Sequence, residues 1–444
     1  MNFPDAVGYL LSLGHETLTI KLGLRNTQTL LSALGTPQRN FPAVQIAGTN
    51  GKGSTAVMLD SVCRAAGIRT GLFTSPHLTS ITERIQIDGQ PIAEIDFARL
   101  TARVRDTAAE LRESGKLESL PTFFEHVTAI ALLAFREARV DLAILETGLG
   151  GRLDSTTAAG ADIVAITSIA MDHEQYLGHA LEEIAAEKAA IIRPGVTAIV
   201  APQMAEALAV INQRSKAAGV EPTFVAGAII NGTPEDGRCR ITFPTAPFKV
   251  ENVLLGLRGR HQVTNAAVAV ALADALRERG FVISTAAIKT GLEGAVHPGR
   301  LELRTGNPHI LLDGAHNPAA ARTLREYLEE FVKHPINMIF GAMRDKDLEQ
   351  LARILFPVAK KVILTELDNP RAATGDMLLK AAKGAISDGA ISLASSPRDA
   401  LSRVAEIASP QDLICVTGSL YLIGEVRALL GEQPSLIASQ MAAH

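Results

Sequence analysis

A glycine-rich segment, Gly48-Thr49-Asn50-Gly51-Lys52-Gly53-Ser54-Thr55, carries the strongest chemical signal in the sequence. It directly follows the apolar run Ala43–Ala47 and precedes a helical pattern at Ala56–Ala66. Glycines let successive backbone N–H groups point toward a phosphate, a lysine adds positive charge, and a serine or threonine hydroxyl can bind magnesium. Gly53 stands between the lysine and the hydroxyl, which departs from the common GxxxxGK[ST] spacing. A plain glycine-rich turn is the alternative, but the strand–loop–helix context favours a nucleotide phosphate site.

Polar residues also follow two other apolar runs. Glu146 comes directly after Val140–Leu145 and opens a second glycine-rich loop, and Asp172-His173 comes shortly after Asp162–Thr167. A carboxylate at the end of a buried strand suits a hard cation such as Mg²⁺, although an ion pair with Arg152 or a helix cap is the alternative. A lone histidine is more often structural than a ligand. Because ligands of open α/β sheets bind beyond the carboxyl ends of the strands, these groups are expected to converge.

Lys188 occupies an unusual place in the predicted helix Leu181–Ile192. Leu181, Ile184, Lys188 and Ile191 fall on one face of that helix, so the lysine lies on an apolar stripe. An unpaired ammonium group would be costly there. The lysine therefore either extends its charged end to water or pairs with a carboxylate, or it serves the site with an altered charge.

A second set of polar residues lies in the C-terminal third of the chain. Asp313-Gly314-Ala315-His316-Asn317-Pro318 follows the apolar run His309–Leu312, and His297-Pro298-Gly299-Arg300-Leu301-Glu302 lies upstream of it. Arg300 and Asp313 could close over a nucleotide held by an earlier domain. Taken singly, each could equally be a turn residue.

Short apolar runs alternate with helical patterns along the chain, which predicts an α/β fold with parallel sheets. Each run is mostly apolar on consecutive positions, as expected of strands covered on both faces. Residues between Ser215 and Arg260 alternate and carry the turn signals Asn231-Gly232 and Glu235-Asp236-Gly237, which predicts a small antiparallel excursion. The predicted strands are Ala43–Ala47, Val140–Leu145, Asp162–Thr167, Thr197–Ala201, His309–Leu312, Asn337–Phe340, Lys361–Thr365 and Leu413–Thr417, and the clearest predicted helices are Thr128–Ala138, Leu181–Ile192 and Thr264–Arg277.

The segment His297-Pro298-Gly299 is the predicted domain boundary. Residues 1–296 would form an ATP-binding domain around a mostly parallel sheet of the P-loop ATPase type. Residues 297–444 would form a smaller, Rossmann-like α/β domain.

Composition narrows the classes of partner. The 444 residues are 47% hydrophobic and 20% charged, with a net charge of −4, so nucleic acid is not an expected partner. The three cysteines are far apart, which argues against disulfides and a structural zinc site. The first residues lack the basic start of a signal peptide, and no run approaches the ~18 apolar residues of a membrane helix. The sequence therefore predicts a soluble cytoplasmic protein without a membrane partner.

Taken together, the motifs resemble those of the folylpolyglutamate synthase/dihydrofolate synthase family, within the wider group of Mur-type ligases. The Gly-Lys-Gly-Ser form of the first loop favours the folate branch over the peptidoglycan branch, whose members typically have Gly-Lys-Thr/Ser. The resemblance spans nearly the whole chain. The motifs that carry it, in order, are Gly48–Ser54, Ser75-Pro76-His77-Leu78, Glu146–Asp154, Asp172-His173, Glu187-Lys188, His297–Glu302, Asp313–Pro318 and Gly418-Ser419-Leu420-Tyr421.

The resemblance implies a role for each matching residue. The ATP phosphates would be held by Thr49, Asn50, Gly51, Lys52, Gly53 and Ser54, and the nucleotide would also contact Asn265, Arg300, Asp313 and His316. Magnesium would be bound by Ser75, Glu146 and His173, with Ser54 as a further candidate. Lys52, Lys188 and His173 would be catalytic, and Lys188 would match the family's carbamylated lysine. The pterin end of the substrate would lie near Leu22, Gly23, Leu24, Thr122, Phe123, Phe124, Glu125, Leu153, Asp154 and Ser155.

The implied reaction uses ATP and Mg²⁺ to join L-glutamate to a reduced folate or to dihydropteroate through an acyl phosphate. Members of the family are commonly monomeric, and the resemblance implies an enzyme with both activities. A Mur-type ligase acting on a nucleotide-linked muramyl substrate and a P-loop ATPase without ligation are the alternatives. Two departures from the family pattern stand out. Ser155-Thr156-Thr157 follows Asp154 where Ala-Thr-Asn is more frequent, and Ala189-Ala190 follows Lys188 where Ala-Gly is usual. The first departure lies beside the expected pterin site and bears on substrate preference.

Overall fold

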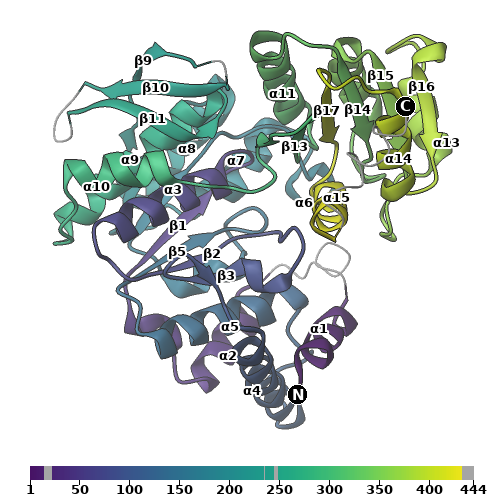
Figure 1. The fold of residues 1–444 in the computed structure, drawn as a ribbon. Coiled ribbons are helices and arrows are strands. Elements are labelled where there is room, and N and C mark those ends of the chain that lie inside the picture. Colours follow the sequence, from purple (N-terminus) through teal and green to yellow (C-terminus); the bar gives the residue numbers. More distant parts are fainter. Residues whose placement is uncertain (15–22, 235, 245–248, 433–444) are drawn as a thin grey trace. The chain divides into compact units, whose positions relative to one another are not determined.

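The computed structural model describes residues 1–14, 23–234, 236–244 and 249–432 (Figure 1). The expected substrate residue Leu22 and the turn residue Glu235 lie outside this range. The chain divides into two compact units, each with its own sheet. The first unit comprises Met1–Asn231, Ile241–Gly256 and Gln262–Val296, and the second comprises Gly232–Arg240, Leu257–His261 and His297–His444.

An eight-stranded sheet forms the centre of the first unit. Its strand order is β4-β3-β2-β5-β1-β6-β7-β8, and every pair from β2 to β8 is parallel. Only β3 and β4, at one edge, run antiparallel to their neighbours. The strands are β1 (Ala43–Ala47), β2 (Thr70–Phe73), β3 (Ile85–Ile87), β4 (Gln90–Pro91), β5 (Leu142–Glu146), β6 (Ile163–Ile166), β7 (Thr197–Val200) and β8 (Thr223–Phe224).

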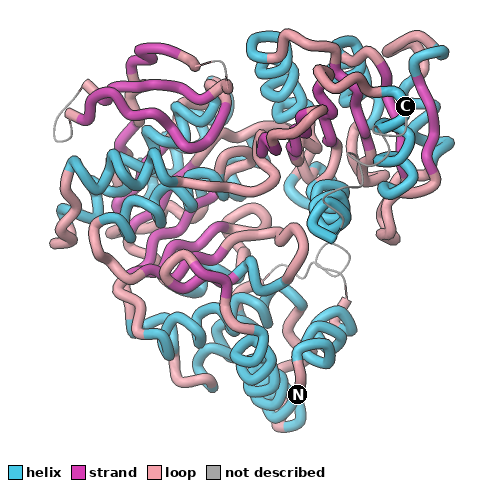
Figure 2. Tube along the Cα trace, viewed as in Figure 1, coloured by secondary structure: helices cyan, strands magenta, loops and turns pink. Residues whose placement is uncertain are grey.

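The central strands β1, β5 and β6 are buried along their whole length, as their consecutive apolar residues predicted. Helices cover both faces of the sheet (Figures 1 and 2). Helix α5 packs against β2 and β3, and α3 packs against β1, β2 and β5. The helices of this unit are α1 (Phe3–Ser12), α2 (Arg25–Ala33), α3 (Lys52–Ala65), α4 (Glu94–Glu113), α5 (Phe123–Ala138), α6 (Glu174–Leu177), α7 (Leu181–Ala189), α8 (Ala205–Ala218), α9 (His261–Glu278) and α10 (Thr285–Gly294), with His261 itself assigned to the second unit.

Helices α3 and α10 approach each other closely at Gly291. A Cβ atom at this position would lie 2.4 Å from the Cα of Val62 and 2.5 Å from its backbone nitrogen. Such distances are far below van der Waals contact, so only glycine lets the two backbones lie this close. The position of α3, the helix that follows the phosphate loop, therefore depends on a segment late in the unit.

We expect Gly291→Ala to destabilise the protein by about 2 kcal/mol, because the new methyl group must push the two helices apart. The midpoint of thermal unfolding measures this effect. Gly294→Ala in the same helix is the matched control, since the nearest atom to its Cβ, the Ser61 Oγ, would lie at 3.9 Å. If the two variants unfold at the same temperature, the close contact does not limit stability.

A separate three-stranded sheet has the order β11-β10-β9 and is formed by β9 (Ile229–Gly232), β10 (Arg238–Phe243) and β11 (Val250–Arg258). The predicted excursion began too early, at Ser215. Helix α8 continues to Ala218, and β8 then pairs in parallel with β7 of the large sheet. The pair Asn231-Gly232, interpreted as a turn, instead ends strand β9, because a turn-forming dipeptide can also close a strand.

The second unit contains a six-stranded sheet of order β12-β13-β17-β14-β15-β16. All its pairs are parallel except β12 with β13. Its strands are β12 (Glu302–Arg304), β13 (His309–Asp313), β14 (Ile336–Phe340), β15 (Lys361–Thr365), β16 (Ile391–Ala394) and β17 (Leu413–Thr417). Its helices are α11 (Pro318–Phe331), α12 (Leu348–Leu355), α13 (Gly375–Ala382), α14 (Pro397–Ile407) and α15 (Leu420–Glu432). The predicted fold class, a large mostly parallel sheet unit plus a smaller α/β unit, is confirmed.

The described helices include none that combines the length and the apolar character needed to span a bilayer. Cys63, Cys239 and Cys415 are all buried free thiols. Burial raises the pKa of each of them, so they are poor nucleophiles at neutral pH.

Candidate active site

The phosphate loop joins the end of β1 to the start of α3. Its N-terminal part is tied to the neighbouring loop after β6, because the amides of Thr49 and Asn50 both donate to the carbonyl of Ser168, at 2.8 and 3.1 Å. Helix α3 begins at Lys52. The amides of its first turn have no acceptor within the helix and are the natural donors to an anion. The loop thus places a helix N-terminus at the carboxyl edge of the sheet.

Two glycines of the loop are required by the space around them. Gly48 has φ +151° and Gly51 has φ +89°, both in the region that favours glycine. A Cβ at Gly48 would lie 1.9 Å from the Thr167 Oγ1, and one at Gly51 would lie 2.3 Å from the Asn265 Oδ1. The structure therefore brings the predicted nucleotide residue Asn265, on α9, directly against the loop.

Gln262 is a member of this cluster that the motifs did not indicate. Its Nε2 donates to the Ser54 Oγ at 3.3 Å, and its Oε1 accepts from the Asn265 Nδ2 at 2.9 Å. It lies one helical turn before Asn265 on the same face of α9, and this spacing was the only signal for it in the sequence. Gln262 thereby links Asn265 to the hydroxyl expected to bind magnesium.

Lys188 is buried beneath the phosphate loop. Its side chain is 4% exposed, and its Nζ donates to the Gly48 carbonyl at 2.8 Å. Burial lowers its pKa to about 7, and repulsion from Lys52 adds to the shift, while Asp172, Asp154 and Glu187 oppose it. The alternative in which this lysine extends its charge to water is wrong. Its surroundings connect the phosphate loop, the Asp172-His173 loop and the second glycine-rich loop.

Lys52 stands at the first position of α3, where its charge adds to the positive end of the helix. Its Nζ donates to the Thr49 carbonyl at 3.3 Å, and its side chain is half-buried. Thr49 in turn bonds through its Oγ1 to the carbonyl and the amide of Ala170, at 3.0 and 3.1 Å. The phosphate loop is therefore fastened to the segment that leads to Asp172 and His173.

The expected magnesium residues Ser75 and Glu146 lie together, because β2 and β5 are parallel neighbours. The Ser75 amide donates to the Glu146 Oε2 at 3.1 Å, and Glu146 is only 5% exposed. Arg152 is not its partner. Arg152 forms an ion pair with Glu187 at 2.9 Å, so the alternative that Glu146 serves as the partner of Arg152 is wrong.

The other expected magnesium residue, His173, has a left-handed backbone with φ 52° and stands at the start of α6. The Asp172 Oδ1 accepts from its amide at 2.8 Å. Within the described ranges, no cluster of three or more His, Cys, Asp and Glu side chains forms a ready-made metal cage. Magnesium that arrives with nucleotide phosphates needs only one or two protein ligands, and the carboxylate of Glu146 and the hydroxyl of Ser54 are the oxygen donors it prefers.

Of the residues expected near the pterin, Glu125 and Asp154 both support their own loops. Glu125 caps α5 through Thr122 and accepts from the Thr27 Oγ1 at 2.9 Å. The Asp154 carboxylate accepts from the amides of Gly148 and Leu149 at 2.9 and 3.0 Å. Burial raises the pKa of Asp154, and the hydrogen bonds oppose this shift. Both carboxylates thus hold backbone in place.

Several of the remaining described members of this set lie on α5 or at the second glycine-rich loop. The Phe124 ring packs against the backbone of Gly148, where a Cβ atom would lie 2.5 Å from the Phe124 Cζ. The Ser155 and Thr128 hydroxyls lie 2.5 Å apart. Phe123 is buried, and Leu153 is partly exposed. Gly23 and Leu24 precede α2 and are also partly exposed. The structure brings Phe124 and Ser155 to the same loop.

In the second unit, Arg300, Asp313 and His316 lie around the end of β13. The Asp313 carboxylate accepts from the amides of Leu301 and Ala315, at 2.9 and 3.0 Å. Burial raises its pKa although the charge of Arg300 acts in the opposite direction. The His316 Nδ1 lies 2.8 Å from the Gly314 carbonyl. The three predicted residues therefore form one local cluster.

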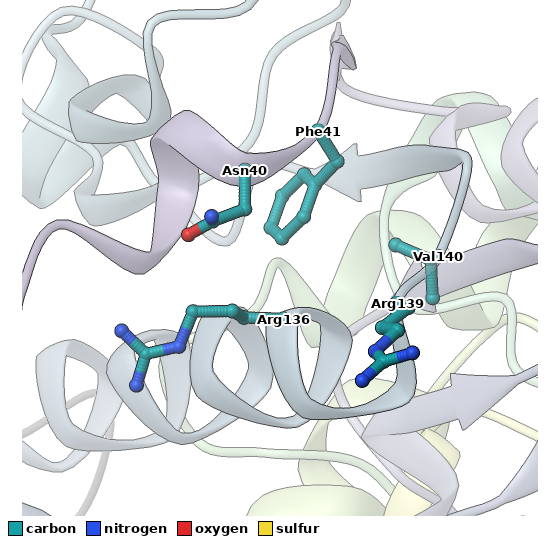
Figure 3. A pocket seen from close by; sticks show the side chains of 5 residues that line it. All are labelled: Asn40, Phe41, Arg136, Arg139 and Val140. Carbon is teal, nitrogen blue, oxygen red and sulfur yellow. The ribbon is translucent and has the colours of Figure 1, made fainter.

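A pocket lined by Asn40, Phe41, Arg136, Arg139 and Val140 lies elsewhere (Figure 3). Phe41 precedes β1 and Val140 precedes β5, so this pocket opens at the amino ends of these strands. Arg136 is held by the Leu34 carbonyl at 3.1 Å. Gly48 and Glu146 lie at the opposite, carboxyl ends, and the pocket is not part of the candidate site.

Comparison with known proteins agrees with this geometry. Residues 46–273 match the Mur ligase middle domain, and residues 299–420 match the Mur ligase glutamate ligase domain. A dihydrofolate synthase/folylpolyglutamate synthase of Bacillus subtilis is 35% identical over 424 residues, which cover 94% of this chain and 97% of that protein. The chain belongs to the folylpolyglutamate synthase/dihydrofolate synthase family.

Solved structures of family members share the fold. The Mycobacterium tuberculosis folylpolyglutamate synthase complexed with ADP matches with a TM-score of 0.88 at 31% identity, covering 96% of this chain and 99% of that one. The Escherichia coli FolC protein in complex with DHPP and ADP matches with a TM-score of 0.85 at 32% identity, covering 98% and 99%. The family predicted from the motifs is confirmed, and the chain is an ATP-dependent ligase. The interpretation as an ATPase without ligation finds no support.

Proposed function

We propose that this chain joins L-glutamate to the carboxylate of a folate or of dihydropteroate, using ATP and Mg²⁺. The observation that carries the proposal is the near full-length similarity to enzymes named for both activities, among them the Bacillus subtilis protein. The local geometry supports it, because a helix N-terminus, Lys52 and the buried Lys188 meet at one loop.

In this proposal residues 1–296 act as the ATP-binding domain and residues 297–444 as the ligase domain. The phosphates are held by Thr49–Ser54, while Asn265, Arg300, Asp313 and His316 contact the nucleotide. The proposed phosphate contacts of Thr49–Ser54 rest on the shape of the loop at Gly48 and Gly51, where any side chain would collide with Thr167 or Asn265. Ser54, Ser75, Glu146 and His173 are the proposed magnesium residues. Gly23, Leu24, Thr122–Glu125 and Leu153–Ser155 border the pterin.

A free carboxylate is a poor electrophile at neutral pH, so ligation needs activation. Bound ATP supplies the phosphoryl group that converts the carboxylate to an acyl phosphate, with Mg²⁺ offsetting its charge. Lys52 and the first-turn amides of α3 stabilise the negative charge on that group. The amino group of glutamate then attacks the acyl carbon through a tetrahedral intermediate, and phosphate leaves. The loops around Lys188 hold the reacting groups in place, which accounts for a large part of the rate.

We also propose that Lys188 is carbamylated in the active enzyme. Carbon dioxide adds to the neutral amine, a proton is released, and the product is a carboxylate. A pKa of about 7 leaves much of this amine in the neutral form that reacts, and the charge of Lys52 nearby would favour the carboxylate that is formed. Lys188 is therefore well suited to the reaction.

Phosphate release with ATP, Mg²⁺ and L-glutamate tests the proposed function, with dihydropteroate in one assay and a tetrahydrofolate in the other. We expect release to require glutamate together with a pterin substrate. Activity with both substrates means a bifunctional enzyme, and activity with one identifies the branch. If folded protein releases no phosphate with either substrate, the proposal is wrong. We propose that the working form is a cytoplasmic monomer. Size-exclusion chromatography with light scattering measures the oligomeric state.

A further inference from the structure

A polar side chain sits in the middle of the central strand β1. Gln45 is fully buried between Val44 and Ile46, at a position where its neighbours in β5 and β6, Leu145 and Val164, are apolar. A buried amide is costly unless it is hydrogen-bonded. The amide of Gln45 must therefore be explained by what it contacts.

The Gln45 Nε2 donates to two hydroxyl groups at once. It lies 3.0 Å from the Thr156 Oγ1 and 2.7 Å from the Thr157 Oγ1. These threonines belong to the short helix η3 (Ser155–Ala159), directly after the second glycine-rich loop. Thr157 stands where the more frequent family pattern, Ala-Thr-Asn, has asparagine, whereas Thr156 matches that pattern.

Each threonine hydroxyl accepts a hydrogen bond from Gln45, so the single proton of that hydroxyl can be donated to the loop. Thr156 donates to the Asp154 carboxylate, and Thr157 donates to the Gly151 carbonyl at 2.7 Å. Asp154 in turn holds the start of the loop, because its other carboxylate oxygen accepts from the amides of Gly148 and Leu149. A directed chain of hydrogen bonds thus runs from the amide of β1 to the loop.

We propose that Gln45 is a positioning residue for the pterin end of the substrate, acting through the Thr156 and Thr157 hydroxyls on the loop Gly148–Asp154. The proposal rests on the proposed function, which places the pterin beside Leu153–Ser155. The donor group of Gln45 is what matters, because an acceptor in its place would turn both hydroxyl protons away from Asp154 and Gly151.

The Gln45 Oε1 supports a role for the donor end alone. This oxygen is buried without a hydrogen-bond partner, so half of the amide contributes nothing and is costly to bury. A methionine would fill the same space without that cost. The retained donor is the only hydrogen-bonding function that the side chain performs in the described structure.

Steady-state kinetics of Gln45→Met and Gln45→Glu tests the proposal. Both replacements keep the shape of the side chain; Gln45→Met removes its donor at every pH, and Gln45→Glu removes it when the carboxyl group is ionised. We expect the KM for the pterin substrate to rise about tenfold, the effect of one buried hydrogen bond, and the KM for ATP to change less than about twofold. Thr157→Val should act in the same direction, and Thr157→Ser, which keeps the hydroxyl, should restore the wild-type KM.

Asn337 offers a matched control. It too is a fully buried amide within a strand, β14, with its Nδ2 donating to Asp412 at 2.9 Å and its Oδ1 without a partner. Asn337→Leu should lower the unfolding temperature and leave the KM for the pterin unchanged. If it raises that KM as Gln45→Met does, the effect is a general loss of stability and the proposal is overturned.

Two further outcomes are decisive. If wild-type enzyme turns over a pterin substrate and neither Gln45→Met nor Thr157→Val changes its KM, Gln45 is a core residue only and the inference is wrong. If wild-type enzyme turns over no pterin, the proposed function fails, and so does the assigned substrate.

Amide hydrogen exchange at Gly148 and Leu149 measures, without any substrate, how firmly the loop is held. Unchanged exchange in Gln45→Met shows that the hydrogen-bond chain does not hold the loop. Thr157 is partly exposed, so its variants keep the test valid if Gln45→Met does not fold.

Discussion

Replacing Lys52 by alanine is expected to lower turnover by about 100-fold or more, since each such charge-stabilising contact contributes roughly 2.7–4 kcal/mol. The physical reason is its place at the N-terminus of α3, where its ammonium group and the helix dipole act on the same anion. The protein should remain folded, because the side chain makes one hydrogen bond, to the Thr49 carbonyl at 3.3 Å, and is half-buried.

Phosphate release at saturating substrates, together with the unfolding temperature, measures this prediction. Lys216→Ala is the matched control, because Lys216 is an exposed lysine on α8 and its removal changes the net charge equally. Turnover near the wild-type rate in folded Lys52→Ala would show that this lysine does not stabilise the transferring phosphoryl group.

Lys188→Ala is expected to lower turnover at least as much, and short carboxylic acids such as acetate should restore part of it. The substitution removes the proposed carbamate and leaves a buried space beneath the Gly48 carbonyl. A small carboxylate can occupy that space and supply the missing charge. Lys188→Arg is the control, since a guanidinium group cannot form this carbamate and should not be rescued.

The pH dependence follows from the same amine. Burial lowers its pKa to about 7, and carbon dioxide reacts only with the neutral form, so modification and activity should rise as the pH passes through 7. If Lys188 is unmodified, its lowered pKa also makes the free energy of unfolding depend on pH. The unfolded chain would bind more protons than the folded chain between pH 7 and 10.5, so the free energy of unfolding would rise with pH over that range. A well-ordered crystal structure of active enzyme with a plain lysine at 188 would exclude the carbamate.

The parts of the fold that the sequence predicts are those governed by local pattern. Strand β1 and strand β15 were predicted at their observed bounds, because each is mostly apolar on consecutive positions. Strand β2 was not predicted. It has four residues, two of which are Thr70 and Gly71, and the absence of a side chain at Gly71 lets the Phe135 ring lie against the backbone. A requirement of that kind comes from the partner and leaves no local pattern.

The candidate site shows the same division. The place of Lys188 on an apolar helix face followed from helical periodicity, and the polar residues after β1 and β5 followed from strand ends. That the lysine is buried and does not reach water came from the structure. The link from Gln262 to Ser54 and the chain from Gln45 to Gly151 join segments far apart in the sequence. Glu125 and Asp154 were expected beside substrate, and their hydrogen bonds show that they also organise backbone, which a residue type alone does not reveal.

The contact between α3 and α10 bears on how the protein is made. A ribosome releases the phosphate loop early, but the helix that fixes α3 in place, with Gly291 against Val62, emerges only after the three strands β9 to β11. The nucleotide site should therefore stay incomplete on a nascent chain until that late segment has left the exit tunnel. We expect stalled chains that end before α10 to bind ATP more weakly than chains extended past Val296, which contain both helices of this contact.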